Sequence, residues 1–337
     1  MCYSARYAAG APGFGAGDFI KGNIASMPSK TYNGLSSRLR GLARQDPAVI
    51  PSFFRYEFRR RWGGAQDRRL TAGGGAVLPA LISLNPTRRC NLRCRMCFQY
   101  RRESEIPDTL AWYHADQELP LSAWVNLLDE VAAWRLRQSG PHGPPLPPWS
   151  RLLDRLATWR PVVYVTGGEP LLYPQVVELL AAARSRRLLV HLQTNGTLLA
   201  GAAPDLASLG LQMVSVSLDG PPEVHDRIRG VPGSFRVRRR ARGRIPVGFS
   251  PDLPDSLLSP YYLDLAHPFP QECRHLWMAC RILPDGSVSP CLHLVMGRIT
   301  EAPLSRIWNN DHCRSLRRLA AQRLFPGCTR CCYRRFQ

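Results

Sequence analysis

Short apolar runs alternate with helical patterns along the middle of the chain. Runs of strand length, rich in Val, Leu and Ile, stand at 77–84, 161–166, 188–193 and 213–218. Apolar residues at helical spacing occur in the segment that Ser122 is expected to cap, and in 149–159, 174–187 and 198–209. Strands that alternate with helices predict an α/β fold built on a parallel sheet.

Chemically distinctive residues come directly after these predicted strands. Cys90, Cys94 and Cys97 follow the first strand, 167–170 (Gly-Gly-Glu-Pro) the second, 194–196 (Thr-Asn-Gly) the third and 219–220 (Asp-Gly) the fourth. In parallel (β/α) barrels the loops after the carboxyl ends of the strands build the active site. The hydrophobic pattern and the chemistry therefore predict one site at that end of the sheet.

The three closely spaced cysteines suit an iron–sulfur cluster with one open iron. A four-iron cluster normally takes four thiolates, so Cys90, Cys94 and Cys97 would leave one iron free for another ligand. A structural zinc site needs a closed set of four ligands, usually as two separated pairs. Three clustered cysteines cannot all pair as disulfides among themselves. A chance spacing or another kind of metal site stays open as the alternative.

The spacing C-x3-C-x2-C resembles the signature of the radical S-adenosylmethionine (radical SAM) enzymes, although Met96 stands where that family often has an aromatic residue. In the family the open iron binds the amino and carboxylate groups of SAM, and an electron splits SAM into methionine and a 5′-deoxyadenosyl radical. The run Gly167-Gly168-Glu169 resembles the family motif that receives the SAM amino group. Glycine suits this role because it lets backbone carbonyls approach an ammonium closely.

The resemblance implies a partial (β/α) barrel and further contacts to SAM. It assigns Ser217, on the fourth strand, and Asp219, directly after it, to the ribose, and it turns Asn195 toward the cofactor. The segment 225–230 resembles the family's H-D-x-x-R-G, in which Arg229 is the candidate partner of the SAM carboxylate because a guanidinium matches it with two hydrogen bonds. A solvated strand face, a turn asparagine and a structural arginine are the plainer interpretations.

A second group of cysteines lies near the end of the chain, at 273, 280, 291, 313, 328, 331 and 332. Cys273 to Cys291, with the turn 284–286 between short strands, resembles the opening of the SPASM domain, which holds auxiliary iron–sulfur clusters. The resemblance implies one auxiliary [4Fe–4S] cluster. Its preferred ligands are Cys273, Cys291, Cys328 and Cys331, with Cys280 and Cys332 in reserve. A structural zinc is the competing interpretation, and Cys2 and Cys313 are expected to be free thiols.

These patterns divide the chain into three parts. Residues 1–76 form an N-terminal extension that is expected to be partly disordered, 77–250 the barrel with an insertion at about 101–160, and 267–337 the SPASM-like domain. After the fourth strand only 245–249 can supply another, so the barrel is expected to be shortened to about five strands. We expect the C-terminal domain or a partner chain to cover the exposed parallel edge beside the cofactor, or else weak SAM binding and a damaged enzyme.

Composition adds a strongly basic surface and a reducing compartment. The net charge of +20 comes mostly from arginine, which suits RNA, anionic lipid or an acidic peptide, or reflects a bias of the genome. No RNA-binding module is recognisable, but nucleic acid is not excluded. No stretch is long and apolar enough to span a membrane, and no secretory signal opens the chain. Eleven cysteines then indicate metal or redox chemistry in the cytoplasm.

The resulting hypothesis is a radical SAM enzyme that abstracts hydrogen during peptide or protein side-chain modification. Its cofactors would be SAM, a [4Fe–4S] cluster and an auxiliary cluster, and its partners a peptide or protein substrate and an electron donor such as a flavodoxin or ferredoxin. Two alternatives stay open, a catalytically impaired iron–sulfur or zinc-binding protein and an RNA-modifying radical SAM enzyme. No residue stands out as a catalytic acid or base.

Overall fold

The computed structural model describes the parts of the chain that carry the predicted sheet and most of its helices. They are residues 73–76, 79–95, 97, 117–133, 161–211, 213–217, 219, 222–235, 273, 275–291, 294–322 and 328. The predicted extension before residue 73, the helix at 149–159, the strand at 245–249 and the cysteines at 2, 331 and 332 lie outside the described residues.

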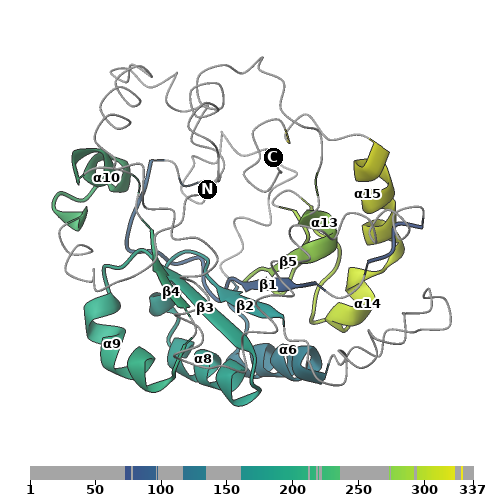
Figure 1. Cartoon of the computed structure of the whole chain (residues 1–337), viewed down its shortest axis with the longest axis horizontal. Coiled ribbons are helices and arrows are strands. Elements are labelled where there is room, and N and C mark those ends of the chain that lie inside the picture. The colour runs from purple at the N-terminus through teal and green to yellow at the C-terminus, as the bar shows by residue number, and fades with distance from the viewer. Residues whose placement is uncertain are drawn as a thin grey trace, which may run out of the picture.

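Six strands form one mixed sheet in the order β4-β3-β2-β1-β5-β6 (Figure 1). They are β1 Leu81–Leu84, β2 Val162–Val165, β3 Leu189–Thr194, β4 Met213–Val216, β5 Ala279–Ile282 and β6 Val288–Ser289. Strands β1 to β5 are parallel, and β6 runs antiparallel to β5. The prediction of an α/β fold with a largely parallel sheet is confirmed, and the fifth described parallel strand is β5 rather than the predicted 245–249.

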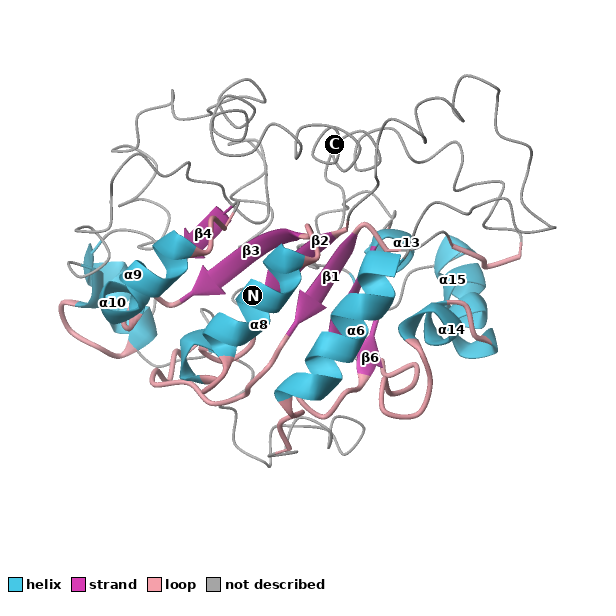
Figure 2. Cartoon of the chain, turned by 90° about the horizontal axis from the view of Figure 1, so that it is seen from below, coloured by secondary structure: helices cyan, strands magenta, loops and turns pink. Residues whose placement is uncertain are grey.

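The described residues contain eight helices, of which the periodicity predicted those over 121–133, 176–185 and 199–208. They are α6 Leu121–Ala133, the short 3-10 helix η5 Pro170–Leu172, α8 Val176–Ser185, α9 Leu199–Ser208, α10 Pro222–Arg229, α13 His275–Met278, α14 Leu304–Trp308 and α15 Asp311–Gln322. Helix α6 begins at Leu121, so Ser122 lies inside its first turn and is not its cap. Helices α6 and α8 lie along one face of the sheet (Figure 2).

The two faces of the sheet differ in character because side chains alternate along each strand. The face toward α6 and α8 is apolar, and its residues are buried in one core: Ile82, Leu84, Val163, Val165, Val190, Leu192, Cys280 and Ile282. On the other face the strand register places polar side chains in one row, Arg281–Ser83–Tyr164–His191. The row continues to β4, where Ser215 Oγ lies 2.5 Å from His191 Nε2.

The C-terminal domain contributes to this sheet through β5, which pairs with β1. Residues 284–286 form the turn of the β5–β6 hairpin, as predicted, and Cys291 follows β6. Strand β5 pairs at the edge opposite β4, and the covering of the exposed edge by this domain or by a partner chain stays a prediction. Residues Ala279–Ile282 pair in parallel with the apolar strand β1, and Ile282 lies in register with Leu84.

A buried arginine ties the C-terminal helices together. The guanidinium of Arg317, on α15, donates to the carbonyl oxygens of Leu276 at 2.9 Å and Trp308 at 2.8 Å. It also stacks on the Trp308 ring, 4.2 Å from the centroid. Burial lowers the pKa of Arg317 to about 10. Because a buried cation needs hydrogen-bond acceptors, these carbonyls fix α15 against α13 and α14.

Candidate functional site

The cysteine loop lies after the carboxyl end of β1 and against α10. The described cysteines form no disulfide; Cys94 is buried, and Cys90 and Cys97 are half-buried. The backbone N–H of Leu92 points at the Cys90 sulfur, 3.4 Å away. The N–H of Arg95 donates to the carbonyl of Ile228 in α10 at 2.9 Å, which holds the loop beside that helix.

The two glycines after β2 let this loop pack directly on the sheet. The N–H of Gly168 donates to the carbonyl of Thr87 at 3.0 Å, and that of Glu169 to the carbonyl of Arg89 at 2.8 Å. A Cβ atom at Gly168 would lie 2.3 Å from the Arg89 oxygen, closer than any side chain can stand. Gly167 adopts a φ of 131°, which favours glycine. Glycine is therefore required here for close backbone approach.

Glu169 connects the ends of β2 and β3. Its side chain is fully buried. One carboxylate oxygen accepts from the Thr194 hydroxyl at 2.7 Å and from the Leu171 N–H at 3.2 Å, and the other accepts from the Asn195 N–H at 2.7 Å. The carboxylate thus fixes the turn that presents Asn195. Its predicted role toward the SAM amino group stays a prediction.

Asn195 contacts the cysteine loop through its side-chain amide. The amide nitrogen donates to Asn91 Oδ1 at 2.8 Å and lies 3.8 Å from the Cys90 sulfur. Thr197 completes the group, because its hydroxyl donates to Asn195 Oδ1 at 2.6 Å and accepts from Asn91 Nδ2 at 2.8 Å. The sequence interpretation missed Asn91 and Thr197. The sequence signal that could have indicated them is their position: Asn91 directly follows Cys90, and Thr197 directly follows the Thr-Asn-Gly run at 194–196.

Arg229 reaches the same loop from α10. Its guanidinium donates through Nε and Nη2 to both oxygens of Asp219, the second at 2.9 Å, and through Nη1 to the Cys94 sulfur at 3.6 Å. His225 stands behind this pair and accepts the Asp219 backbone N–H on Nδ1 at 3.1 Å. The guanidinium and the carboxylate are 5% and 9% exposed, so the pair lies in a region of low dielectric.

Burial and the Arg229–Asp219 ion pair determine the pKa shifts of Arg229 and Cys94. Burial works to lower the pKa of Arg229, but the hydrogen bonds and charge of Asp219 outweigh it and hold the pKa above its ordinary value. Burial raises the pKa of the Cys94 thiol, and the nearby Arg229 guanidinium offsets part of that rise. The charge of the Cys90 thiolate also raises the pKa of Cys94.

Ser217 lies one step further from the cysteines. Its backbone N–H donates to the Thr194 carbonyl at 3.1 Å, and its hydroxyl accepts from Gln193 Nε2 at 3.0 Å. Gln193 and His191 lie on one face of β3, and Asn195 follows on the same side. Asn195 lies at the cysteine loop, Gln193 contacts Ser217 after β4, and His191 contacts Ser215 on β4. The structure therefore brings the predicted residues of three strand ends together around Cys90 and Cys94.

The cysteines of the C-terminal domain differ in their surroundings. Cys273, Cys291 and Cys328 are half-buried. Cys280, held in reserve as a ligand, is 1% exposed on the apolar face of β5, beside Cys313 and Arg317. Burial raises the pKa of the Cys280 thiol far above its ordinary value, which disfavours the thiolate that a metal needs. Its place in the core makes Cys280 a packing residue, as the alternation of β5 could have indicated.

The donors around the cysteine loop fit an iron–sulfur cluster. Iron-bound thiolates are stabilised by N–H groups, and Leu92 and Asn195 supply them to Cys90 and Arg229 to Cys94. Within the described residues, no three His, Cys, Asp or Glu side chains come close enough to hold one metal ion. A four-iron cluster differs from a single ion because each thiolate binds a different iron.

The fold and the site define an α/β protein whose parallel sheet presents a triplet of thiols at its carboxyl end. Residues 84–245 match the model of the radical SAM superfamily, and residues 273–332 match that of the SPASM iron–sulfur cluster-binding domain. The chain belongs to the radical SAM superfamily and carries a SPASM domain after the radical SAM domain. Membership implies SAM and a [4Fe–4S] cluster for the first domain, and auxiliary iron–sulfur clusters for the second.

Similar proteins of known name are enzymes. An AdoMet-dependent heme synthase of Oleidesulfovibrio alaskensis is 29% identical over 52% of this chain and 38% of its own length. A PqqA peptide cyclase of Ruegeria pomeroyi is 28% identical over 57% of this chain and 45% of its own length. The chain thus spans less than half the length of either relative. The structure of Streptococcus suis SuiB bound to precursor peptide SuiA aligns with a TM-score of 0.48 at 14% identity, over 75% of this chain and 71% of SuiB.

In the part of the chain that the structure describes, no helix has the length and apolar character that crossing a bilayer requires.

Proposed function

We propose that this chain cleaves SAM reductively and uses the product to abstract a hydrogen atom from a peptide or protein. One observation carries the proposal. The sulfurs of Cys90 and Cys94 lie within hydrogen-bonding reach of Asn195, after β3, and Arg229, beyond β4. Side chains from separate strand ends thus converge on the cysteine loop, which is where a cofactor binds in a parallel α/β fold.

Each residue of the loop has a part in this proposal. Cys90, Cys94 and Cys97 would hold the [4Fe–4S] cluster and leave one iron for SAM. When bound, the cluster and SAM would supply the electron and the 5′-deoxyadenosyl radical that hydrogen abstraction needs. Asn91 and Thr197 orient the Asn195 amide toward the Cys90 sulfur. The buried carboxylate of Glu169 keeps that turn in place.

The remaining predicted residues would position SAM. Gly167, Gly168 and Glu169 pack against the segment that leads into the cysteine loop, and their backbone and the Glu169 carboxylate would accept the SAM amino group. Ser217 and Asp219 would contact the ribose. The support for this placement is that both residues follow β4 and that Asp219 binds the Arg229 guanidinium, which reaches the Cys94 sulfur. The preferred auxiliary ligands are Cys273, Cys291, Cys328 and Cys331, in the segment that matches the SPASM model.

A peptide or protein is the substrate class that we propose. One of the relatives is a PqqA peptide cyclase, matched over 200 residues. The polar row from Arg281 to His191 lies on the sheet face opposite α6 and α8 and offers hydrogen-bonding groups to a substrate. A one-electron donor such as a flavodoxin or ferredoxin would reduce the cluster, and the cytoplasmic location stays a prediction.

An anaerobic turnover assay tests the proposal. The full chain is reconstituted with iron and sulfide, mixed with SAM and dithionite, and 5′-deoxyadenosine is measured by chromatography. The proposal expects 5′-deoxyadenosine that depends on SAM, reductant and iron. An iron-loaded protein that yields none would contradict the proposal and favour the impaired iron–sulfur protein.

A further inference from the structure

The Arg229–Asp219 pair directs the Arg229 guanidinium at the Cys94 sulfur rather than leaving it free for a ligand carboxylate such as that of SAM. Three N–H groups of Arg229 already have acceptors, two on Asp219 and one on Cys94. The Arg95–Ile228 backbone hydrogen bond holds the cysteine loop beside the end of α10, where Arg229 lies. Because Asp219 holds Nε and Nη2, the Nη1 group is fixed facing the sulfur.

A donor at this position acts on electron transfer. Reduction adds one electron to a cluster, supplied by an external one-electron donor, and the added negative charge spreads onto the iron-bound sulfurs. Hydrogen bonds to those sulfurs and nearby positive charge stabilise the reduced form, and they raise the reduction potential. Since Arg229 and Asp219 are 5% and 9% exposed, solvent screens their charges little.

We propose that the Arg229–Asp219 pair sets the reduction potential of the cluster held by Cys90, Cys94 and Cys97. Arg229 raises the potential by donating to the Cys94 sulfur. Asp219 holds the guanidinium in place and offsets part of its charge. This inference rests on the proposed function, because it requires that the three cysteines hold a cluster.

The two partners therefore act with opposite signs. Replacing Arg229 by glutamine removes the positive charge and leaves Asp219 negative, so the reduced cluster is destabilised and the potential falls. Replacing Asp219 by asparagine keeps an acceptor for the guanidinium and leaves its charge uncompensated, so the potential rises. If the Arg229–Asp219 pair only held the fold together, the two variants would not shift the reduction potential in opposite directions.

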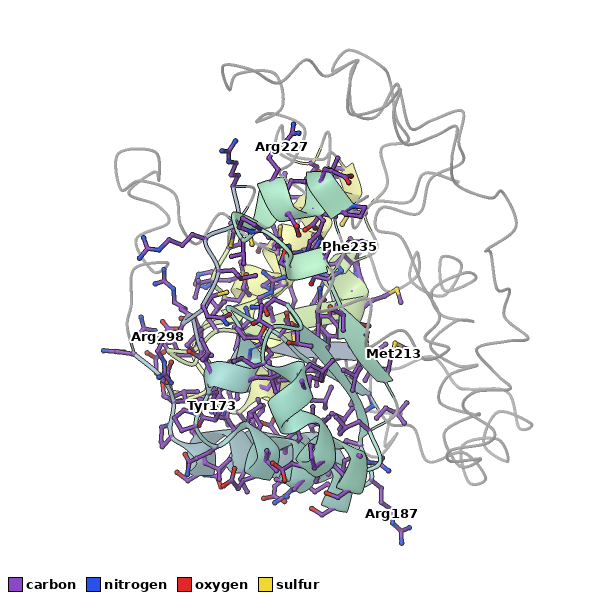
Figure 3. The ribbon with its side chains drawn as sticks, turned by 90° about the vertical axis from the view of Figure 1, so that its left-hand side faces the viewer. Tyr173, Arg187, Met213, Arg227, Phe235 and Arg298 are labelled. Atoms are coloured by element: carbon purple, nitrogen blue, oxygen red, sulfur yellow. The ribbon has the colours of Figure 1, made fainter. Side chains whose placement is uncertain are left out.

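Arg227 provides the matched control. It lies two residues from Arg229 on the same helix, but its side chain is exposed and points away from the sheet (Figure 3). R227Q removes the same charge from α10 where water screens it. Any change in potential that comes from net charge alone would appear in R227Q as well.

The test is a redox titration followed by electron paramagnetic resonance, on anaerobically reconstituted full-length protein without SAM. The signal of this cluster is the one that a C90A/C94A/C97A variant lacks. We expect R229Q to lower the midpoint potential by about 59 mV, which for a one-electron couple is a tenfold change. D219N should raise the midpoint potential, and R227Q should change it less than either. Leaving SAM out keeps any contact of Arg229 with the SAM carboxylate from contributing.

Equal potentials for R229Q and R227Q, or a shift of R229Q and D219N in the same direction, would overturn the inference while the proposed function stands. Where R229Q binds too little iron to titrate, D219N decides alone, and a potential that is unchanged or lower overturns the inference. A wild-type protein that binds no cluster contradicts the proposed function, and the inference falls with it.

Discussion

The buried carboxylate of Glu169 accepts a hydrogen bond of 2.7 Å from the backbone N–H of Asn195. The same side chain accepts the Thr194 hydroxyl, so a charged group without solvent contact joins the ends of β2 and β3. A buried carboxylate is stable only when N–H and O–H groups surround it. The position of Asn195 beside Cys90 therefore depends on Glu169.

We expect E169Q to destabilise the fold. Glutamine has one carbonyl oxygen and would turn an NH₂ group toward the Asn195 N–H or the Thr194 hydroxyl. The loss of a charged acceptor should lower the free energy of unfolding by about 1.5–3 kcal/mol. Urea unfolding of the protein without cofactors measures this. The control is E178Q on the exposed side of α8, which should change stability by less than about 0.5 kcal/mol. Equal stability of the two variants would show that Glu169 does not fix the strand ends.

A methyl group at Gly168 should displace the cysteine loop. The new Cβ would meet the Arg88 and Arg89 carbonyl oxygens at 2.4 and 2.3 Å, and backbone cannot move aside as a side-chain end can. G168A should therefore lower stability by about 1–3 kcal/mol, the cost of overpacking, and reduce the iron bound on reconstitution. Gly201 in α9 has open space around its Cβ position, so G201A should stabilise the protein by about 0.5–1 kcal/mol. A G168A protein with wild-type stability and iron content would contradict the packing described here.

Acid should destabilise the protein partly through His191. Burial lowers the pKa of His191 to about 4, from an ordinary value of 6.5. Between these values the unfolded chain takes up a proton and the folded chain does not, so stability falls as pH drops from 6.5 toward 4. H191Q removes this proton uptake and should lose less stability than the wild type between pH 7 and pH 4.5, by up to about 2–3 kcal/mol.

Urea midpoints at both pH values test the acid effect, with H312Q on the exposed side of α15 as the control. The buried His275, whose pKa burial also lowers to about 4, contributes equally in all three proteins. An H191Q protein with the wild-type loss on acidification would rule out His191 as a source of the effect.

The strands and helices of the core could be predicted because their signal is local. Alternating burial follows the apolar runs, so β1, β2 and β4 lie within the predicted ranges and β3 extends one residue beyond its range, to Thr194. Helix α8 is shorter than predicted at both ends, since the residues after Pro174 form a turn before Val176.

The edge that the C-terminal domain joins could not be predicted. Strand β5 has only four residues, and its partner β1 lies far away in the sequence. Nothing in the local alternation of Ala279–Ile282 distinguishes the edge of β1 from the edge of β4. Pairing over such distances is decided by the whole fold, which a local pattern does not encode.

The candidate site could be predicted in its residue types but only partly in its contacts. The spacing of Cys90, Cys94 and Cys97 is a strong local signal, and the family models agree with it. The hydrogen bonds of Glu169 join the ends of β2 and β3, and the bidentate Arg229–Asp219 pair joins α10 to the end of β4. Only the fold brings these segments together.

Iron content together with SAM cleavage tests the central claim most directly. After anaerobic reconstitution, wild-type protein should bind about eight irons and the C90A/C94A/C97A variant about four, those of the auxiliary cluster. Wild-type protein should form 5′-deoxyadenosine from SAM and dithionite, and so should C2A, which removes a cysteine outside both predicted sites, while the triple variant should form none. 5′-Deoxyadenosine from the triple variant would contradict the account.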